Sequence, residues 1–135
     1  ERKIRHSIPD WLDESALETF GEAEWEKEIK ALNTTAPLVI RVNDLKTTTE
    51  KLIKILNNKF EIQASKIEGY PSALLLKEHY KITDLDPYKK GFFEIQDANS
   101  QLVAQWADPK PGMKVIDACA GAGGKTLHMA TLMEK

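Results

Sequence analysis

The residues best suited to chemistry lie in one glycine-rich stretch, VIDACAGAGGKT, at residues 115–126. An apolar run precedes the glycines and an amphipathic run follows them, which predicts a turn between a strand and a helix. Unpaired backbone N–H groups and the dipole at the start of a helix make such a turn a cradle for a polar ligand. The spacing of the glycines decides which ligand class fits.

Two nucleotide-binding patterns fit this stretch poorly. A Walker loop requires a glycine six residues before its lysine, but counting back from Lys125 that position is Cys119. The dinucleotide fingerprint places its third glycine where this chain has Thr126, whose branched side chain would obstruct close helix packing. Neither an NTPase nor a dinucleotide-binding protein is therefore the preferred interpretation.

A third pattern, D-x-x-x-G-x-G, is matched in order by Asp117, Gly121 and Gly123. It resembles motif I of S-adenosylmethionine-dependent methyltransferases. Glycines let the backbone approach a bulky ligand without an intervening Cβ, and an acidic side chain at the strand end can orient the loop. The alternative at this point is a tight turn that holds no ligand.

The rest of the chain predicts a mixed α/β protein that brings this loop to a sheet. The order strand, helix, strand, strand over residues 38–78 is the first part of a split β-α-β-β plait, a framework that many unrelated binding domains share. The apolar periodicity predicts helices at 9–20, 22–33 and 97–107, and two more that start at Thr47 or Thr48 and at residue 124. Asp97 or Asn99 is expected to cap the helix at 97–107. Strands are predicted at 38–43, 61–67, 72–78, 91–97 and 114–120.

Several side chains have an expected position. We expect Trp11 and Trp25 to pack in the core or between the two leading helices. Arg41 and Asn43 share one face of their strand and form either a polar contact surface or an edge. The inward face of the last helix is expected to carry Leu127, Ala130 and Met133.

Composition narrows the class of protein. Of the 135 residues, 41% are hydrophobic and 30% are charged, which is typical of a soluble globular protein. No apolar run approaches the ~20 residues that span a bilayer, and the single cysteine excludes an internal disulfide and a cysteine-based metal cluster. We expect an intracellular, cytoplasmic protein.

The net charge of −2 gives no overall attraction to nucleic acid, so RNA binding would depend on a local patch. Basic residues that could contact phosphate, or could equally be ordinary solvated side chains, fall in three clusters: Arg2, Lys3, Arg5 and His6; Lys46, Lys51 and Lys54; Lys77, Lys81, Lys89 and Lys90.

The flanks of the glycine loop carry a more specific resemblance. Residues 91–126 are similar to the region in which RNA cytosine-5 methyltransferases of the NOL/NOP/sun family join an RNA-binding domain to the catalytic domain. IPDWL and the R-V-N of residues 41–43 resemble the family's leader, and Gly121-Ala122 stands where many members have alanine-proline. The family's phenylalanine-rich strand, Q-D pair, S-Q-L, P-K-P-G and D-x-C-A-x-x-G-G-K-T are matched by Phe92 and Phe93, Gln96 and Asp97, Ser100 to Leu102, Pro109 to Gly112, and Asp117 to Thr126.

This resemblance implies three parts: a helical leader at 1–36, a small α/β RNA-binding domain at 37–90, and the beginning of a Rossmann-like methyltransferase domain at 91–135. It implies S-adenosyl-L-methionine as cofactor, rRNA or tRNA as partner, and a monomer. The cofactor-binding residues would be Asp117, Cys119, Ala120, Gly121, Ala122, Gly123, Gly124 and Lys125.

The resemblance also implies a mechanism. A cysteine thiolate adds to carbon 6 of cytosine, carbon 5 takes the methyl group, and a base removes the proton at carbon 5. The family's two working cysteines belong to later motifs, beyond Lys135, so no residue of this chain is expected to be catalytic and the chain alone is expected to be inactive. Cys119 is expected to be a small buried residue. The alternatives are a non-catalytic RNA-binding module and, third, a methyltransferase acting on protein or small molecules.

Overall fold

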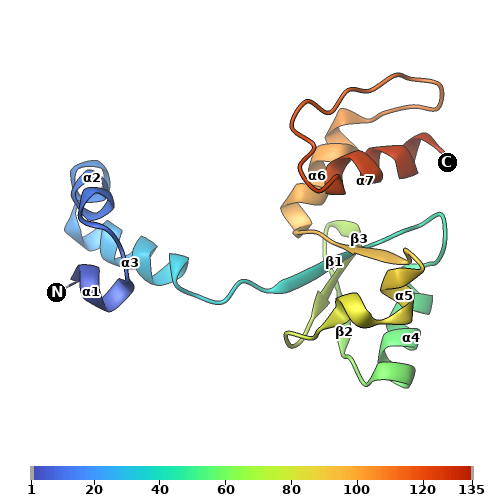
Figure 1. The fold of residues 1–135 in the computed structure, drawn as a ribbon, viewed down its shortest axis with the longest axis horizontal. Coiled ribbons are helices and arrows are strands. Elements are labelled where there is room, and N and C mark those ends of the chain that lie inside the picture. Colours follow the sequence, from blue (N-terminus) through green and yellow to red (C-terminus); the bar gives the residue numbers. More distant parts are fainter. Residues whose placement is uncertain (1, 135) are drawn as a thin grey trace. The chain divides into compact units, whose positions relative to one another are not determined.

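The computed structural model describes residues 2–134 and divides the chain into two compact units, residues 1–36 and 37–135. The first unit is helical. The expected pair of helices is confirmed, with a break at Gly21, whose φ of 74° suits a residue without a side chain. Its helices are α1 (Arg2–His6), α2 (Asp10–Phe20) and α3 (Glu22–Leu32) (Figure 1).

A small core holds the first unit together. Ala16, Trp25 and Ile29 are buried in it. Trp25 also donates from Nε1 to Asp13 Oδ1 at 2.7 Å, and Arg2 Nε donates to the same carboxylate at 2.8 Å. The hydrogen bonds from Arg2 and Trp25 hold the pKa of Asp13 below its ordinary value.

Only one of the two leading tryptophans packs as expected. Trp25 is buried, but Trp11 is 69% exposed, so its expected packing between helices is wrong. The physical reason is helical geometry, because α2 turns Asp13 and Ala16 toward α3 and leaves Trp11 on the solvent side.

The second unit is built on a four-stranded antiparallel sheet. Its strand order is β2-β3-β1-β4, and both neighbours of β1 in the sheet come later in the chain (Figure 1). The mixed α/β fold class and the split β-α-β-β order are therefore confirmed. The elements are β1 (Leu38–Val42), α4 (Thr49–Phe60), β2 (Ala64–Ile67), β3 (Tyr70–Leu76), the 3-10 turn η1 (Ile82–Asp84), α5 (Asp86–Lys89), β4 (Phe93–Ile95), α6 (Ala98–Ala107) and α7 (Gly124–Met133).

Local chemistry fixes the ends of the main helices. Thr48 caps α4 by accepting from the backbone N–H of Lys51, and Asp97 caps α6 by accepting from two N–H groups of its first turn. Both caps are among the residues expected from the sequence. Beyond α4, Glu61 takes the left-handed conformation that commonly ends a helix.

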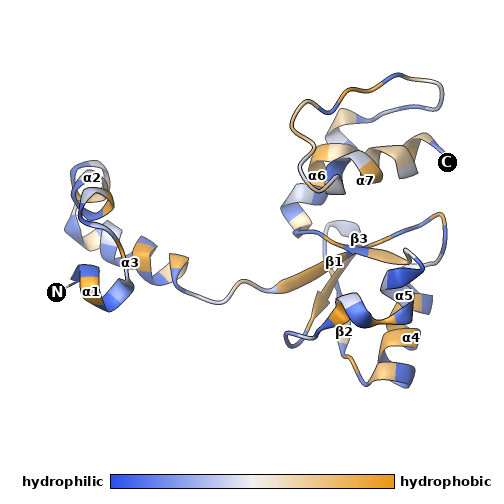
Figure 2. Cartoon of the chain, viewed as in Figure 1, coloured by the Kyte–Doolittle hydropathy of each residue, from blue (hydrophilic) through white to orange (hydrophobic). Residues whose placement is uncertain are grey.

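The main core lies between the sheet and α4. Ile40, Leu52, Leu56, Leu74 and Phe93 are fully buried in it. Alternation along β1 sends Ile40 and Val42 to this face, and the apolar colouring runs along β1 and one side of α4 (Figure 2). The stability of the second unit therefore rests on this layer.

The structure differs from the expected division at residue 90. β4 was expected to open the third domain, yet it pairs with β1, with Phe93 opposite Val42 and Ile95 opposite Ile40. Edge pairing and burial of Phe93 hold β4 in the sheet of the small α/β domain. The first residues of the expected Rossmann-like part thus belong to the preceding sheet.

The opposite face of the sheet carries a buried cation. Arg41 is 2% exposed and donates from Nε to Gln96 Oε1 at 2.7 Å, while Asn43 Nδ2 donates to the carbonyl of Gly91. The expected polar contact surface at Arg41 is therefore wrong, because α6 contacts β1 and β3 on this side of the sheet.

The expected strand at residues 114–120 is also wrong. These residues form an extended segment followed by turns, and Ile116 is 91% exposed. A strand takes its hydrogen bonds from a neighbouring strand, and no strand of the described residues lies beside this segment. In α7 the buried residues are His128 and Thr131, whereas Leu127 is exposed. The inward face expected for this helix is therefore wrong as well.

Among the described residues, no helix has the length and apolarity needed to cross a bilayer.

Candidate functional site

The glycine loop is closed at its base by one carboxylate. Asp117 Oδ2 accepts from Thr126 Oγ1 at 2.7 Å, and Asp117 Oδ1 accepts from the backbone N–H of Cys119 at 3.2 Å. The first contact joins the extended segment to α7, and the second shapes the turn. Asp117 therefore orients the loop, which is one of the roles expected of it.

Two glycines give the loop its path into α7. Gly121 and Gly123 have φ values of 55° and 81°, a region that residues with a side chain rarely adopt. The N–H of Gly123 donates to the carbonyl of Ala120 at 2.8 Å. Gly123 then stands at the N-cap of α7 without a side-chain cap, so the N–H groups of the first turn point away from the helix. They are available to a polar ligand.

The space around the loop is open. A Cβ placed on Gly121 or Gly123 would meet no other heavy atom within 4 Å, and the residues from 118 to 122 are exposed. A cavity of about 160 Å³ adjoins the loop, lined by Val115, Asp117, Thr126, Met129, Ala130 and Met133. Open backbone, free donors and an adjoining apolar cavity fit a ligand with polar and apolar parts.

The predicted site residues from Asp117 to Lys125 come together in this one loop. Cys119 is exposed, so its expected burial is wrong. The reason is the same as for the missing strand, because nothing among the described residues packs on the segment that would bury it. No group of histidine, cysteine and acidic residues in residues 2–134 has the arrangement of a metal site.

Sequence reasoning missed how the loop is attached to the sheet. Gln96 is buried, accepts from Arg41, and receives a hydrogen bond on its own carbonyl from Gln101 Nε2 at 3.1 Å. Its amide lies against the start of α7, where a Cβ on Gly124 would stand 3.7 Å from Nε2. The Gln96 side chain therefore lies between β1 and the start of α7, and the Q-D pair in the sequence was the signal for it.

The positive charge beside Gln96 is the buried guanidinium group of Arg41. Burial lowers the pKa of Arg41, while the charges of Glu94 and Asp44 oppose that effect. Arginine stays protonated in proteins, so Gln96 Oε1 supplies an acceptor to a buried positive charge. The polar pair is therefore buried between the sheet and the start of α7 rather than contacting solvent.

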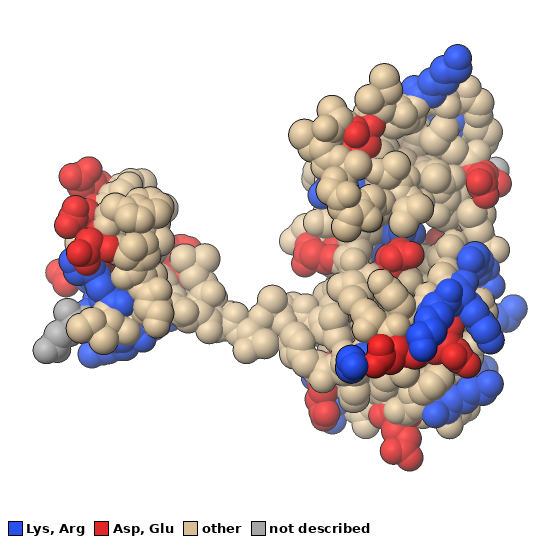
Figure 3. All heavy atoms as spheres, viewed as in Figure 1, with Lys and Arg blue, Asp and Glu red and all other residues tan. Residues whose placement is uncertain are grey.

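The three expected basic clusters have different surroundings. Arg2 and Lys3 are engaged by Asp13 and Asp10. Lys46 Nζ donates to the carbonyl of Lys90 at 2.7 Å, which brings the second and third clusters together. Figure 3 shows basic side chains gathered, with acidic residues between them, over the region of α4 and α5, where the basic residues are lysines. This region is the candidate nucleic-acid surface.

Comparison with known proteins identifies the family of this chain. The family model described as "Methyltr_RsmF/B-like, ferredoxin-like domain" matches residues 8–83. The "Probable ribosomal RNA small subunit methyltransferase B" of Synechocystis sp. is 36% identical over 96% of this chain and 29% of its own length. The ribosomal RNA small subunit methyltransferase B of Serratia proteamaculans is 33% identical over 93% and 29%. The chain thus spans about 29% of the length of these relatives.

Solved structures agree in fold. A methyltransferase homolog protein from Pyrococcus horikoshii superposes with a TM-score of 0.77 at 30% identity, over 97% of this chain and 43% of that one. NSun6 from Pyrococcus horikoshii, solved with SFG, superposes with a TM-score of 0.82 over 93% of this chain and 56% of that one. Its sequence identity is 20%, so the second likeness shows the fold alone.

Proposed function

Because the chain belongs to the family of RsmF/B-like methyltransferases that contain this ferredoxin-like domain, we propose that it is part of an S-adenosylmethionine-dependent RNA methyltransferase. The observation that carries the proposal is the open glycine loop, held at its base by the contact of Asp117 with Thr126. The proposed substrate is a cytosine of rRNA or tRNA, methylated at carbon 5. The chain supplies the cofactor loop and an RNA-docking domain.

The residues proposed to hold the cofactor are Asp117 and the loop from Cys119 to Lys125. When bound, S-adenosylmethionine supplies the methyl group. The N–H groups at the start of α7 can donate to a carboxylate or hydroxyl, and Lys125 adds a cation at the same place. Asp117 keeps the loop in its conformation and presents a carboxylate near a cationic ligand. The glycines leave the backbone free to contact a bulky group.

We propose no catalytic residue within this chain. The only cysteine, Cys119, lies in the cofactor loop, where its N–H is bound to Asp117. Its place in the loop suits it to contact with the cofactor rather than attack on a base. The chain by itself is therefore proposed to be inactive. A cytoplasmic location and a monomeric state complete the proposal.

The cofactor assignment is tested by calorimetric titration of S-adenosylmethionine into the full-length protein. Asp117→Asn weakens both contacts that shape the loop, so the affinity is expected to fall by about tenfold, the equivalent of one charge-assisted hydrogen bond. Asp108→Asn is the matched control, because Asp108 lies in the exposed turn before the loop. Equal affinities for the two variants would refute the cofactor loop.

A non-catalytic RNA-binding module is the second candidate, favoured by the extended segment at 113–117 that pairs with no strand of the described residues. The same titration separates the two functions. A full-length protein that binds RNA, but in which S-adenosylmethionine gives no heat and does not alter RNA binding, would be such a module.

A further inference from the structure

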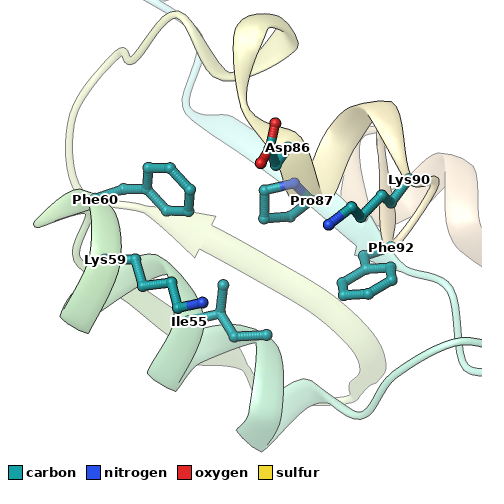
Figure 4. A pocket seen from close by; sticks show the side chains of 7 residues that line it. All are labelled: Ile55, Lys59, Phe60, Asp86, Pro87, Lys90 and Phe92. Carbon is teal, nitrogen blue, oxygen red and sulfur yellow. The ribbon is translucent and has the colours of Figure 1, made fainter.

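A small cavity opens between the end of α4 and α5, on the face of the sheet that α4 covers, and it includes no residue of the glycine loop. Its volume is about 120 Å³. Pockets for drug-sized molecules measure about 300–1,000 Å³, so this one admits a single ring system rather than a whole cofactor. Figure 4 shows the side chains that line it: Ile55, Lys59, Phe60, Asp86, Pro87, Lys90 and Phe92.

The walls of the cavity are apolar and firmly held. Phe60 and Phe92 pack partly against the main core, and their rings lie on different sides of the cavity with Pro87 between them (Figure 4). The turn from α5 to β4 is closed by backbone hydrogen bonds from Phe92 N–H to the Pro87 carbonyl and from Lys90 N–H to the Asp86 carbonyl, both at 2.9 Å. The two rings are therefore a preformed site for another flat group.

The rim of the cavity is cationic. Lys59 comes from α4 and Lys90 from the end of α5, and both ammonium groups point toward the space between them (Figure 4). Lys46 lies next to this rim because its ammonium group donates to the Lys90 carbonyl. One carboxylate, that of Asp86, faces the same space. A bare phosphate would be repelled by Asp86, whereas a nucleobase carries N–H donors that a carboxylate accepts.

We propose that this cavity holds one nucleotide of a single-stranded RNA segment, with the base against Phe60 and Phe92 and its phosphate on Lys59 and Lys90. Single-stranded RNA is recognised through splayed bases that stack on aromatic rings, together with lysine contacts to phosphate. The cavity offers both at the size of one base. The assignment rests on the proposed RNA methyltransferase function and adds to it a docking site outside the cofactor loop.

The phosphate contacts are tested by the salt dependence of RNA affinity. The full chain is titrated into a fluorescein-labelled single-stranded 12-nucleotide RNA, and anisotropy gives the dissociation constant at several salt concentrations. Each phosphate contact contributes about 0.7 to the slope of log K against log salt for single strands. Lys59→Ala combined with Lys90→Ala is therefore expected to reduce the slope by roughly 1.4.

The matched control is Lys27→Ala combined with Lys30→Ala, which removes the same charge from exposed positions of α3 that belong to none of the three basic clusters and do not line the cavity. Base stacking is tested by Phe92→Leu, which keeps an apolar side chain and removes the ring. It is expected to weaken binding about fivefold or more without changing the salt slope. A thermal melt of each variant checks that it is folded.

Two outcomes would overturn the assignment while leaving the RNA function in place: a slope that falls as much in the control as in the cavity variant, or equal affinity for a duplex of the same sequence. If the wild-type protein bound no RNA, both the cavity assignment and the proposed RNA function would be overturned. Competition by an acidic peptide as strong as that by unlabelled RNA would make the cavity a protein-docking site and would also refute the proposal.

Discussion

The sheet at residues 38–95 and the loop region at residues 108–134 belong to one compact unit but are built differently. In the sheet, the apolar strand residues Ile40, Leu74 and Phe93 are fully buried. In the loop region, Ile116 is 91% exposed and Leu127 is 49% exposed. A strand needs a neighbour for its hydrogen bonds, whereas a helix makes its own. That difference explains why α7 forms here and the strand expected before it does not.

The largest expected effect contrasts one leucine from each region. Leu56→Ala empties a fully buried position between α4 and the sheet, so the free energy of unfolding should fall by about 2–5 kcal/mol. Leu127→Ala truncates a half-exposed side chain and should change it by less than about 0.5 kcal/mol. Urea denaturation followed by circular dichroism measures both. Similar losses in the two variants would show that the loop region has a core of its own.

The next effect concerns the residue that joins the two regions. Gln96→Ala removes the acceptor of buried Arg41, and leaving a buried donor without a partner costs about 1–3 kcal/mol. Gln63→Ala is the control, because that glutamine is exposed. Urea denaturation should show a lower free energy of unfolding for Gln96→Ala. In addition, hydrogen exchange in α7 should become faster in Gln96→Ala but not in Gln63→Ala. Unchanged exchange there would mean that Gln96 does not hold the loop against the sheet.

A smaller effect tests the helix starts. Thr48→Ala removes the side-chain cap of α4 and should cost about 0.5–2 kcal/mol. Thr48→Ser keeps the hydroxyl and should restore most of the stability. If Thr48→Ser were as unstable as Thr48→Ala, the methyl group rather than the cap would be the cause. By contrast, α7 has no side-chain cap to lose.

The most local effects distinguish two adjacent glycines of the loop, and the one expected at Gly124 is the smallest of all. Gly123→Ala forces a side chain into a φ of 81° and should cost about 1–2 kcal/mol in local stability. Gly124→Ala has an ordinary helical position and should stabilise α7 by about 0.4–1 kcal/mol, because its Cβ would make a normal contact with Gln96. Hydrogen exchange of α7 measures both. Opposite signs are required, and equal signs would contradict the assigned backbone conformation.

Much of the fold could be read from local patterns. The caps Thr48 and Asp97, the strand of residues 38–42 and the two leading helices are confirmed because each depends on neighbours in the chain. The short α5 and η1 were not predicted, because four and three residues are too few to show a period. Trp11, Arg41 and Cys119 were misplaced because burial depends on what packs from elsewhere, which no local pattern contains.

By itself, the sequence determined the order of the longer helices and of the four strands of the sheet, the helix caps and the glycine turn before α7, because backbone preference and hydrophobic period depend on neighbouring residues. Only the tertiary structure decided that β4 belongs to the small sheet, that Arg41 is buried against Gln96, and that the side chain of Gln96 lies against the start of α7. It also brought Lys59 of one helix opposite Lys90 of another. These are contacts between residues distant in the chain, and their positions follow from packing rather than from local propensity.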